Sequence, residues 1–172
     1  MAESFPRQHA RTRGFTLGRP RNVTVAPDGA RVLFLRSRAG DDPVTCLWAV
    51  DPATGEERLV ATGAEDVDLT AEERARRERA RETASGIVSY AVDDDLAVVT
   101  YVAGGRVFRV DVDSGDTAEV AFPGPAFDAR LSPSGQRVAA VVAGALHVDG
   151  ELVVGEDDPN VTWGLAEFVA AE

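Results

Sequence analysis

Short apolar runs separated by tight turns fill most of this chain. From Arg21 the sequence RNVTVAPDGARVLFLRS places two apolar runs around the turn 27–29, and CLWAV, the turn DPATG and ERLVA follow. Proline fixes φ at the start of such a turn, and glycine readily adopts the left-handed conformation near its end. Each run is short and rich in Val, Leu and Phe, so residues 23–61 are predicted to form about four strands joined by tight turns.

This pattern occurs three times along the chain. Residues 132–135 (SPSG) match residues 26–29 (APDG) position for position, and residues 108–111 (FRVD) match residues 48–51 (WAVD). The piece LHVD at 146–149 fits the same place, with a tighter Asp-Gly turn after it. Repeats of roughly 40 residues, each of four short antiparallel strands, are typical of β-propeller blades. A sandwich or meander without a repeat is the alternative, but it gives no reason for the same turn at the same place in each unit.

The predicted fold is therefore all-β: a partial β-propeller of about three four-stranded antiparallel blades, with one short inserted Arg-rich helix. Known propellers have at least about four blades. We therefore expect the chain to be incomplete or, alternatively, its exposed blade faces to pair with another copy. The predicted parts are a basic lead-in at 1–20, extended, irregular or frayed, then units at 21–63, 87–122 and 123–160, an insertion at 64–86, and the start of another unit at 161–172.

The insertion interrupts the repeat between the first and second units. Thr70 and Glu73 form a capping box, and residues 71–82 contain good helix formers without Pro or Gly. The predicted helix is polar all round, so it has no apolar stripe to dock. It is either a solvated helix held by i,i+4 ion pairs such as Glu73–Arg77, or a segment that binds something.

Composition and charge exclude several classes of function. The formal net charge of −11 argues against a nucleic-acid-binding protein, which carries a basic face. The N-terminus lacks the apolar run of a secretory signal, and nothing approaches the roughly 20 apolar residues of a membrane helix. We therefore expect a cytoplasmic protein with no membrane partner. The single cysteine, Cys46, cannot form an internal disulfide, and no metal or cofactor site is expected.

No catalytic motif occurs in the chain. There is no G-x-S-x-G elbow and no phosphate-binding Walker loop. His9 and His147 have no recognisable partners in a catalytic triad, and His147 lies in an apolar run typical of a strand. On pattern alone, Glu167 and Glu172 would be ordinary surface acids.

Three motifs, in order, resemble the dipeptidyl peptidase IV family of serine peptidases. The last stretch, VTWGLAEFVAAE at 161–172, is similar to a propeller segment that reads roughly W-G-x-A-E-F-x-A-x-E-E in bacterial members. The segment RERAR at 77–81, followed by GIVSY at 86–90, resembles the arginine segment of the cytosolic branch. The lead-in SFPRQHARTRGFTLG is similar to that of actinobacterial members. The resemblance spans nearly the whole chain.

The resemblance implies a site that binds the N-terminus of a peptide substrate. Glu172 would be the first of two adjacent glutamates that bind the free α-amino group. Arg77 would bind the backbone carbonyl of the penultimate residue, with Arg79 and Arg81 as alternatives. In the family, an eight-bladed propeller sits over an α/β-hydrolase domain that releases N-terminal dipeptides, often after Pro or Ala. The Ser, Asp and His of the triad would lie beyond Glu172, so this chain is expected to be inactive without that domain.

Two other functions stay open from the sequence. One is a propeller-type protein-interaction module with no peptidase attached, and the other is an acylaminoacyl-peptidase-like member of the same clan. A second glutamate after Glu172 distinguishes the last, because a blocked N-terminus has no ammonium to bind. The end blades should expose apolar faces and unpaired strand edges, so we also expect self-association into a homo-oligomer.

Overall fold

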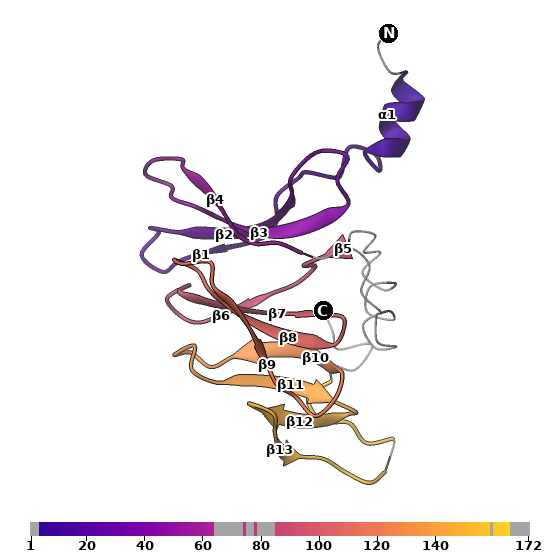
Figure 1. Ribbon diagram of the computed structural model, residues 1–172, viewed down its shortest axis with the longest axis vertical. Helices are drawn as coiled ribbons and strands as arrows, with labels where there is room; N and C mark the ends of the chain where they lie inside the picture. Colours follow the sequence, from indigo (N-terminus) through magenta and orange to yellow (C-terminus); the bar gives the residue numbers. More distant parts are fainter. Residues whose placement is uncertain (1–3, 64–73, 75–77, 79–84, 159, 166–172) are drawn as a thin grey trace.

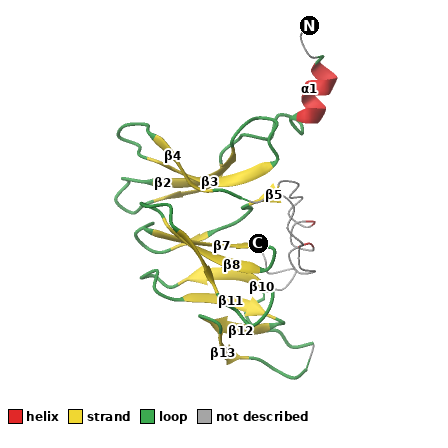
Figure 2. Cartoon of the chain, viewed as in Figure 1, coloured by secondary structure: helices red, strands yellow, loops and turns green. Residues whose placement is uncertain are grey.

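The computed structural model describes residues 4–63, 74, 78, 85–158 and 160–165, and these form three stacked β-sheets, a short strand β5 (Ser85–Gly86) and a helix α1 (Figures 1 and 2). Each sheet is a meander of consecutive antiparallel strands, which confirms the predicted fold class. The first contains β1 (Arg21–Val25), β2 (Val32–Ser37), β3 (Val44–Val50) and β4 (Glu57–Ala61). The second contains β6 (Ala91–Val92), β7 (Val98–Ala103), β8 (Arg106–Asp111) and β9 (Thr117–Val120), and the third β10 (Ala126–Leu131), β11 (Val138–Val142), β12 (Ala145–Val148) and β13 (Glu151–Val154).

Strand register makes the three sheets comparable residue by residue. The last residue pairs of the first hairpin in each sheet are Val25↔Val32, Val92↔Val99 and Leu131↔Val138. The pairing of β1 with β2 and of β10 with β11 shifts at the same place, and the bulged residues Asn22 and Asp128 both have φ 49°. The repeat seen in the sequence is therefore a repeat of backbone geometry, and the first and third sheets also share a bulge.

The turn between the first two strands keeps its shape even where its glycine is absent. Gly29 and Gly135 take φ values of 72° and 68° in the first and third sheets. In the middle sheet Leu96 takes their place with φ 53°, a conformation that L residues rarely adopt. Leu96 is 3% exposed and belongs to the core, so packing of its side chain holds the turn in place of a glycine.

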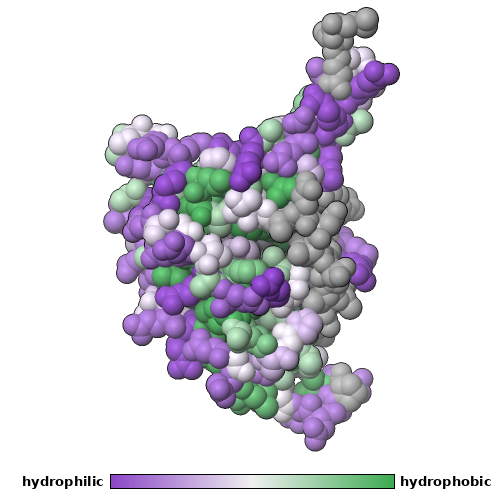
Figure 3. All heavy atoms as spheres, in the orientation of Figure 1, coloured by the Kyte–Doolittle hydropathy of each residue, from purple (hydrophilic) through white to green (hydrophobic). Residues whose placement is uncertain are grey.

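Buried apolar side chains in the described part of the chain gather at the two junctions between sheets. The first junction is built from large residues, among them the fully buried Leu33, Leu35, Leu47, Val99 and Val110. The second junction is lined by smaller ones: Val107, Ala126, Ala129, Val138, Ala140 and Val142. In the space-filling view, apolar side chains show along the sheets and polar ones cover much of their outer ends (Figure 3). Each sheet is therefore stabilised mainly by burial against its neighbour.

Residues 5–11 of the lead-in form a helix, which was not predicted, whereas residues 12–20 are turns or irregular. The helix α1 (Phe5–Arg11) starts after Ser4 and carries a proline in its first turn, where a proline costs no hydrogen bond. It projects from the first sheet (Figure 1), and its side chains are exposed or only partly buried. The rings of Phe5, His9 and Phe15 pack together with centroids 5.9 Å apart. Pro6 suggested irregular structure from the sequence, but its position at the start of a helix favours that helix.

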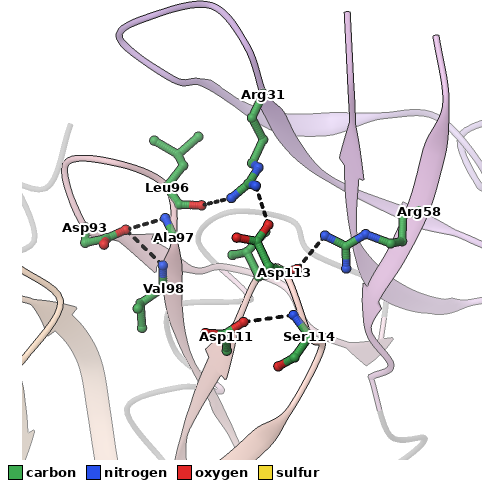
Figure 4. A network of polar contacts seen from close by, with 10 residues as sticks. Arg31, Arg58, Asp93, Leu96, Ala97, Val98, Asp111, Asp113 and Ser114 are labelled. Carbon is green, nitrogen blue, oxygen red and sulfur yellow. Dashed lines mark hydrogen bonds and ion pairs between the residues drawn. The ribbon is translucent and has the colours of Figure 1, made fainter. Parts of the chain in front are cut away.

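Polar contacts reinforce the first junction at the turns (Figure 4). Arg31 donates to the Leu96 carbonyl at 3.0 Å and forms an ion pair with Asp113. Arg58 donates to the Val112 carbonyl at 2.5 Å. Both arginines come from the first sheet and both acceptor carbonyls from the second, so these contacts fix how the two sheets are placed along one another.

Tyr90 joins the same two sheets near the first strands. Its hydroxyl lies 2.5 Å from the Asn22 carbonyl oxygen and 3.1 Å from the Leu33 carbonyl oxygen, and it can donate a hydrogen bond to either. It lies 2.9 Å from the Thr24 hydroxyl. Burial raises the pKa of Tyr90, and the hydrogen bond with Thr24 partly opposes this rise. The neutral phenol is therefore the form that the folded protein favours.

We predict that Tyr90→Phe lowers the free energy of unfolding by about 1 kcal/mol at neutral pH, because the hydroxyl and its partners lose their hydrogen bonds. The raised pKa of Tyr90 also has an alkaline consequence. Its contribution is fully present below the unfolded value of 10.0 and is lost as the pH rises through the higher folded value. Urea unfolding at pH 7 and above pH 10 should therefore show the difference between wild type and Tyr90→Phe shrinking with pH.

Tyr101→Phe is the matched control. Burial also raises the pKa of Tyr101, but its hydroxyl forms no hydrogen bond within the part of the chain that the structure describes. This variant should keep the stability of the wild type at neutral pH. An equal loss in both variants at pH 7 would contradict the role assigned to the Tyr90 hydroxyl.

Candidate functional site

The residues predicted to bind substrate lie outside the described part of the chain. This applies to Arg77, Arg79, Arg81 and Glu172, and also to Glu167. Two neighbours in the insertion, Arg74 and Glu78, are described and are helical. What the structure does describe is where the two segments that carry the predicted residues are anchored.

The Arg-rich insertion leaves and rejoins the fold beside the start of β3. It follows Gly63, just after β4, and ends at β5. The strand β5 pairs in parallel with β3 through Val44↔Ser85 and Thr45↔Gly86, and the Ile87 amide donates to the Thr45 carbonyl at 3.0 Å. This parallel pair was not predicted, because the first unit was expected to be antiparallel throughout and Ser85–Gly86 was assigned to the insertion.

Two glycines form the stem of the insertion. A Cβ on Gly63 would lie 2.3 Å from the Thr45 carbonyl oxygen and 2.5 Å from the Cα of Gly86. Gly86 has φ 79°, and a Cβ there would lie 2.4 Å from the same oxygen. The two chain ends therefore approach so closely that neither position has room for a side chain. This close approach fixes the point from which residues 64–84 begin and end.

The C-terminal segment is anchored on the third sheet. The Asn160 amide donates to the Asp158 carboxylate at 2.9 Å, and the Val161 amide to the Asp158 carbonyl at 3.0 Å. The Trp163 amide then donates to the Gly144 carbonyl at 2.8 Å, in the turn between β11 and β12. The W-G part of the final motif is therefore held by the fold, shortly before residues 166–172, which lie outside the described part of the chain.

Gly164 explains why a glycine follows Trp163 in this motif. It has φ 79°, and a Cβ at this position would lie 3.0 Å from Cγ2 of Val141 and 3.5 Å from Cδ1 of Leu146. A side chain here would be strained by the backbone conformation and crowded by β11 and β12. The absence of a side chain at Gly164 allows its backbone to lie close to β11 and β12.

Both anchors lie on the same edge of the stacked sheets. We call it the entry edge, and define it by the turns between second and third strands, at residues 38–43, 104–105 and 143–144. The stem at Gly63 and Gly86 lies beside the start of the third strand of the first sheet. Trp163 lies beside the corresponding turn of the third sheet, and β5 marks this side in Figure 1. The two motif-bearing segments thus start from one edge, with the middle sheet between their anchors.

Acidic side chains at the opposite edge have structural roles. The Ser114 amide donates to Asp111 and lowers the pKa of this carboxyl. The Val138 amide donates to Asp149, with Arg137 nearby, and lowers its pKa as well. These carboxylates stabilise tight turns by accepting backbone N–H groups, so their shifted pKa values do not indicate catalysis.

The described residues form no metal site, and their histidine and cysteine side chains on the strands have structural surroundings. Among them, no group of three His, Cys, Asp or Glu side chains is placed to hold a metal ion. His147 is buried on β12, with Nδ1 3.2 Å from the Ala145 carbonyl, and Cys46 is buried on β3. No described helix has the length and apolar character of a membrane span.

Known structures share the arrangement of the sheets. No family model matches the sequence. A structure of prolyl endopeptidases is similar over 83% of this chain and 22% of its own, with 15% identity and a TM-score of 0.52. TolB from Acinetobacter baumannii is similar over 78% of this chain and 31% of its own, with 11% identity and a TM-score of 0.48. The tricorn protease is similar over 76% of this chain and 12% of its own, with 16% identity and a TM-score of 0.48.

These comparisons bear on the fold alone. The chain spans less than a third of the length of each of the three structures named. At 15% identity, the likeness to the prolyl endopeptidase structure supports the arrangement of strands and leaves substrate and activity open. With the repeated four-stranded meanders and the burial at each junction, it shows that the three sheets are blades of a β-propeller.

We predict that Gly86→Ala destabilises the fold by roughly 3 kcal/mol, because its Cβ would add a clash with Thr45 to the strain of a left-handed residue. Gly55→Ala is the matched control. Gly55 has φ 73°, but a Cβ there would meet nothing within 4 Å. It should cost only about 1 kcal/mol, the backbone strain alone. Urea unfolding measures both, and equal losses would contradict the close approach at the stem.

Proposed function

We propose that this chain is the propeller part of a serine-type dipeptidyl aminopeptidase, in which it binds the N-terminus of the peptide substrate and helps to gate the active site. One observation carries the proposal. The Arg-rich insertion and the Glu-bearing C-terminal segment, which resemble the two halves of one substrate site, are anchored on the same edge of the propeller blades.

The chemistry of the two segments is complementary to a peptide N-terminus. A free α-ammonium group is matched by carboxylates, of which Glu172 would be the first. The adjacent peptide carbonyl needs a donor, and the guanidinium of Arg77 supplies charged N–H groups, with Arg79 and Arg81 nearby in sequence. Carboxylates that bind an ammonium also set how far a chain can enter, since a blocked or longer N-terminus leaves them unpaired.

The rest of the activity would belong to a hydrolase domain in the same protein. That domain would supply the Ser, His and Asp, and we place it over the entry edge, next to both anchored segments. The peptide substrate and this domain are the proposed partners, and the mechanism requires no cofactor.

We predict that Arg77→Ala in the complete peptidase lowers kcat/KM for a dipeptidyl chromogenic substrate by about ten- to a hundredfold, or about 1.5–3 kcal/mol of transition-state binding. The reason is the loss of a charge-assisted hydrogen bond to the substrate carbonyl. Arg74→Ala and Arg76→Ala are the controls, because they remove a neighbouring positive charge outside the matched motif. These two variants should retain the activity of the wild type.

Three results would overturn the proposal. In the first, Arg77→Ala, Arg79→Ala and Arg81→Ala all keep full kcat/KM, and the segment is then a solvated helix. In the second, an N-acetylated substrate is cleaved better than the free one, and the acylaminoacyl-peptidase alternative then holds. A protein that cleaves neither substrate would instead be an interaction module.

A further inference from the structure

A cavity of about 180 Å³ lies between the second and third blades, beside β7 of the second blade and β10 of the third. Its walls come from residues 89–90 and 100–102 of the second blade and 127–130 of the third. Close-packed protein interiors contain few voids larger than one water, whose share of liquid volume is about 30 Å³. A pocket several times this size between two packed sheets needs an explanation, and the repeat provides one.

Register identifies the equivalent residues in the other blades. Counting back from the pairs Val25↔Val32, Val92↔Val99 and Leu131↔Val138 aligns Tyr90 of the second blade with Ala129 of the third. By the same count, Asn22 aligns with Ser89 and Leu33 with Thr100. The first and second junctions can therefore be compared residue by residue.

At the first junction a tyrosine fills the position. The ring of Tyr90 reaches from the second blade to the first, where its hydroxyl meets the carbonyls of Asn22 and Leu33 and the hydroxyl of Thr24. At the second junction the aligned residue is Ala129, which is buried but has only a methyl group. The residues aligned with Asn22 and Leu33, Ser89 and Thr100, both line the cavity.

We propose that this cavity is a binding site for a phenol ring, supplied by a small phenolic molecule or by the tyrosine side chain of a peptide. The ring would occupy the place that Tyr90 fills at the neighbouring junction, with its hydroxyl toward the carbonyl of Thr100, which aligns with Leu33. This inference rests on the repeat and the cavity, and is independent of the proposed peptidase activity.

The lining suits such a ligand in size and chemistry. Apolar cavities of about 150 Å³ in other proteins accept benzene. The apolar residues Val102, Phe127 and Ala129 are among those that line the cavity, and an aromatic ring can pack against such side chains. Asp128 and Arg130, paired at 2.9 Å, also line the cavity, and the Arg130 side chain is 66% exposed. The exposed arginine indicates that the cavity reaches the surface, where a ligand can enter.

The test uses p-cresol as the probe in a titration followed by ¹H–¹⁵N NMR. We expect shift changes concentrated at residues 89–90, 100–102 and 127–130, with a dissociation constant roughly in the millimolar range for so small a ligand. Toluene, which lacks the hydroxyl, should bind about three- to tenfold more weakly. Shift changes that centre elsewhere, or equal binding of both probes, would overturn the proposal.

The decisive variant is Ala129→Tyr, which should place a tyrosine in the cavity as Tyr90 is placed in the first junction. It should abolish p-cresol binding and raise the melting temperature. Ala30→Tyr adds the same side chain at an exposed turn and should bind like the wild type. If Ala129→Tyr does not fold, Ala129→Leu partly fills the same space and should weaken binding about tenfold. Undiminished binding in a folded Ala129 variant would refute the site.

A final arm distinguishes the two sources of the ring. Acetyl-Gly-Tyr-Gly-amide is titrated beside p-cresol, with acetyl-Gly-Ala-Gly-amide as the control peptide. Binding of the tyrosyl peptide at the same residues identifies a presented side chain as the ligand, and binding of p-cresol alone identifies a small phenol. Failure of both probes would overturn the inference and leave the proposed peptidase function untouched.

Discussion

Burial between neighbouring sheets is the interaction on which the rest of this structure depends. A four-stranded meander cannot enclose its own apolar residues, so each blade is stabilised through the face it shares with the next. Leu33, Leu47 and Val110 are fully buried because two sheets meet over them. The faces without a neighbour behave differently: Val23 and Val25 on β1, and Leu152 and Val153 on β13, are each more than half exposed.

The repeat made this architecture predictable, because the same turn recurs where the same strands end. The residues at 27–29 and 133–135 set a local geometry that no distant contact has to supply. Two features depended on other information. The helix α1 was not predicted, because the prolines and glycines of residues 1–20 indicate irregular structure, although a proline in the first turn suits a helix. The pairing of β5 with β3 brings together residues about 40 apart in sequence, and no local pattern encodes it.

For the candidate site too, the sequence predicted the local motifs but not how they lie relative to one another. The motifs that predicted Arg77 and Glu172 are local, whereas their proximity depends on how many blades separate them and on which edge each segment leaves. The structure supplies the edge, through Gly63, Gly86 and the contact of Trp163 with Gly144. The cavity beside Ala129 could have been suspected from the sequence only with the register known, because the bulge shifts the alignment of the first strands.

Comparison of the two junctions shows how blades of one repeat can differ. The strands and turns are kept from blade to blade, because each is needed to bury the next sheet. Positions that face a junction can vary once neighbouring contacts suffice: Tyr90 stabilises the first junction through its hydroxyl, and Ala129 leaves space at the second. The entry edge can also vary, because an insertion there lengthens a connection between blades without disturbing a junction. Glycines at the stem then let its two ends lie close together beside the start of β3.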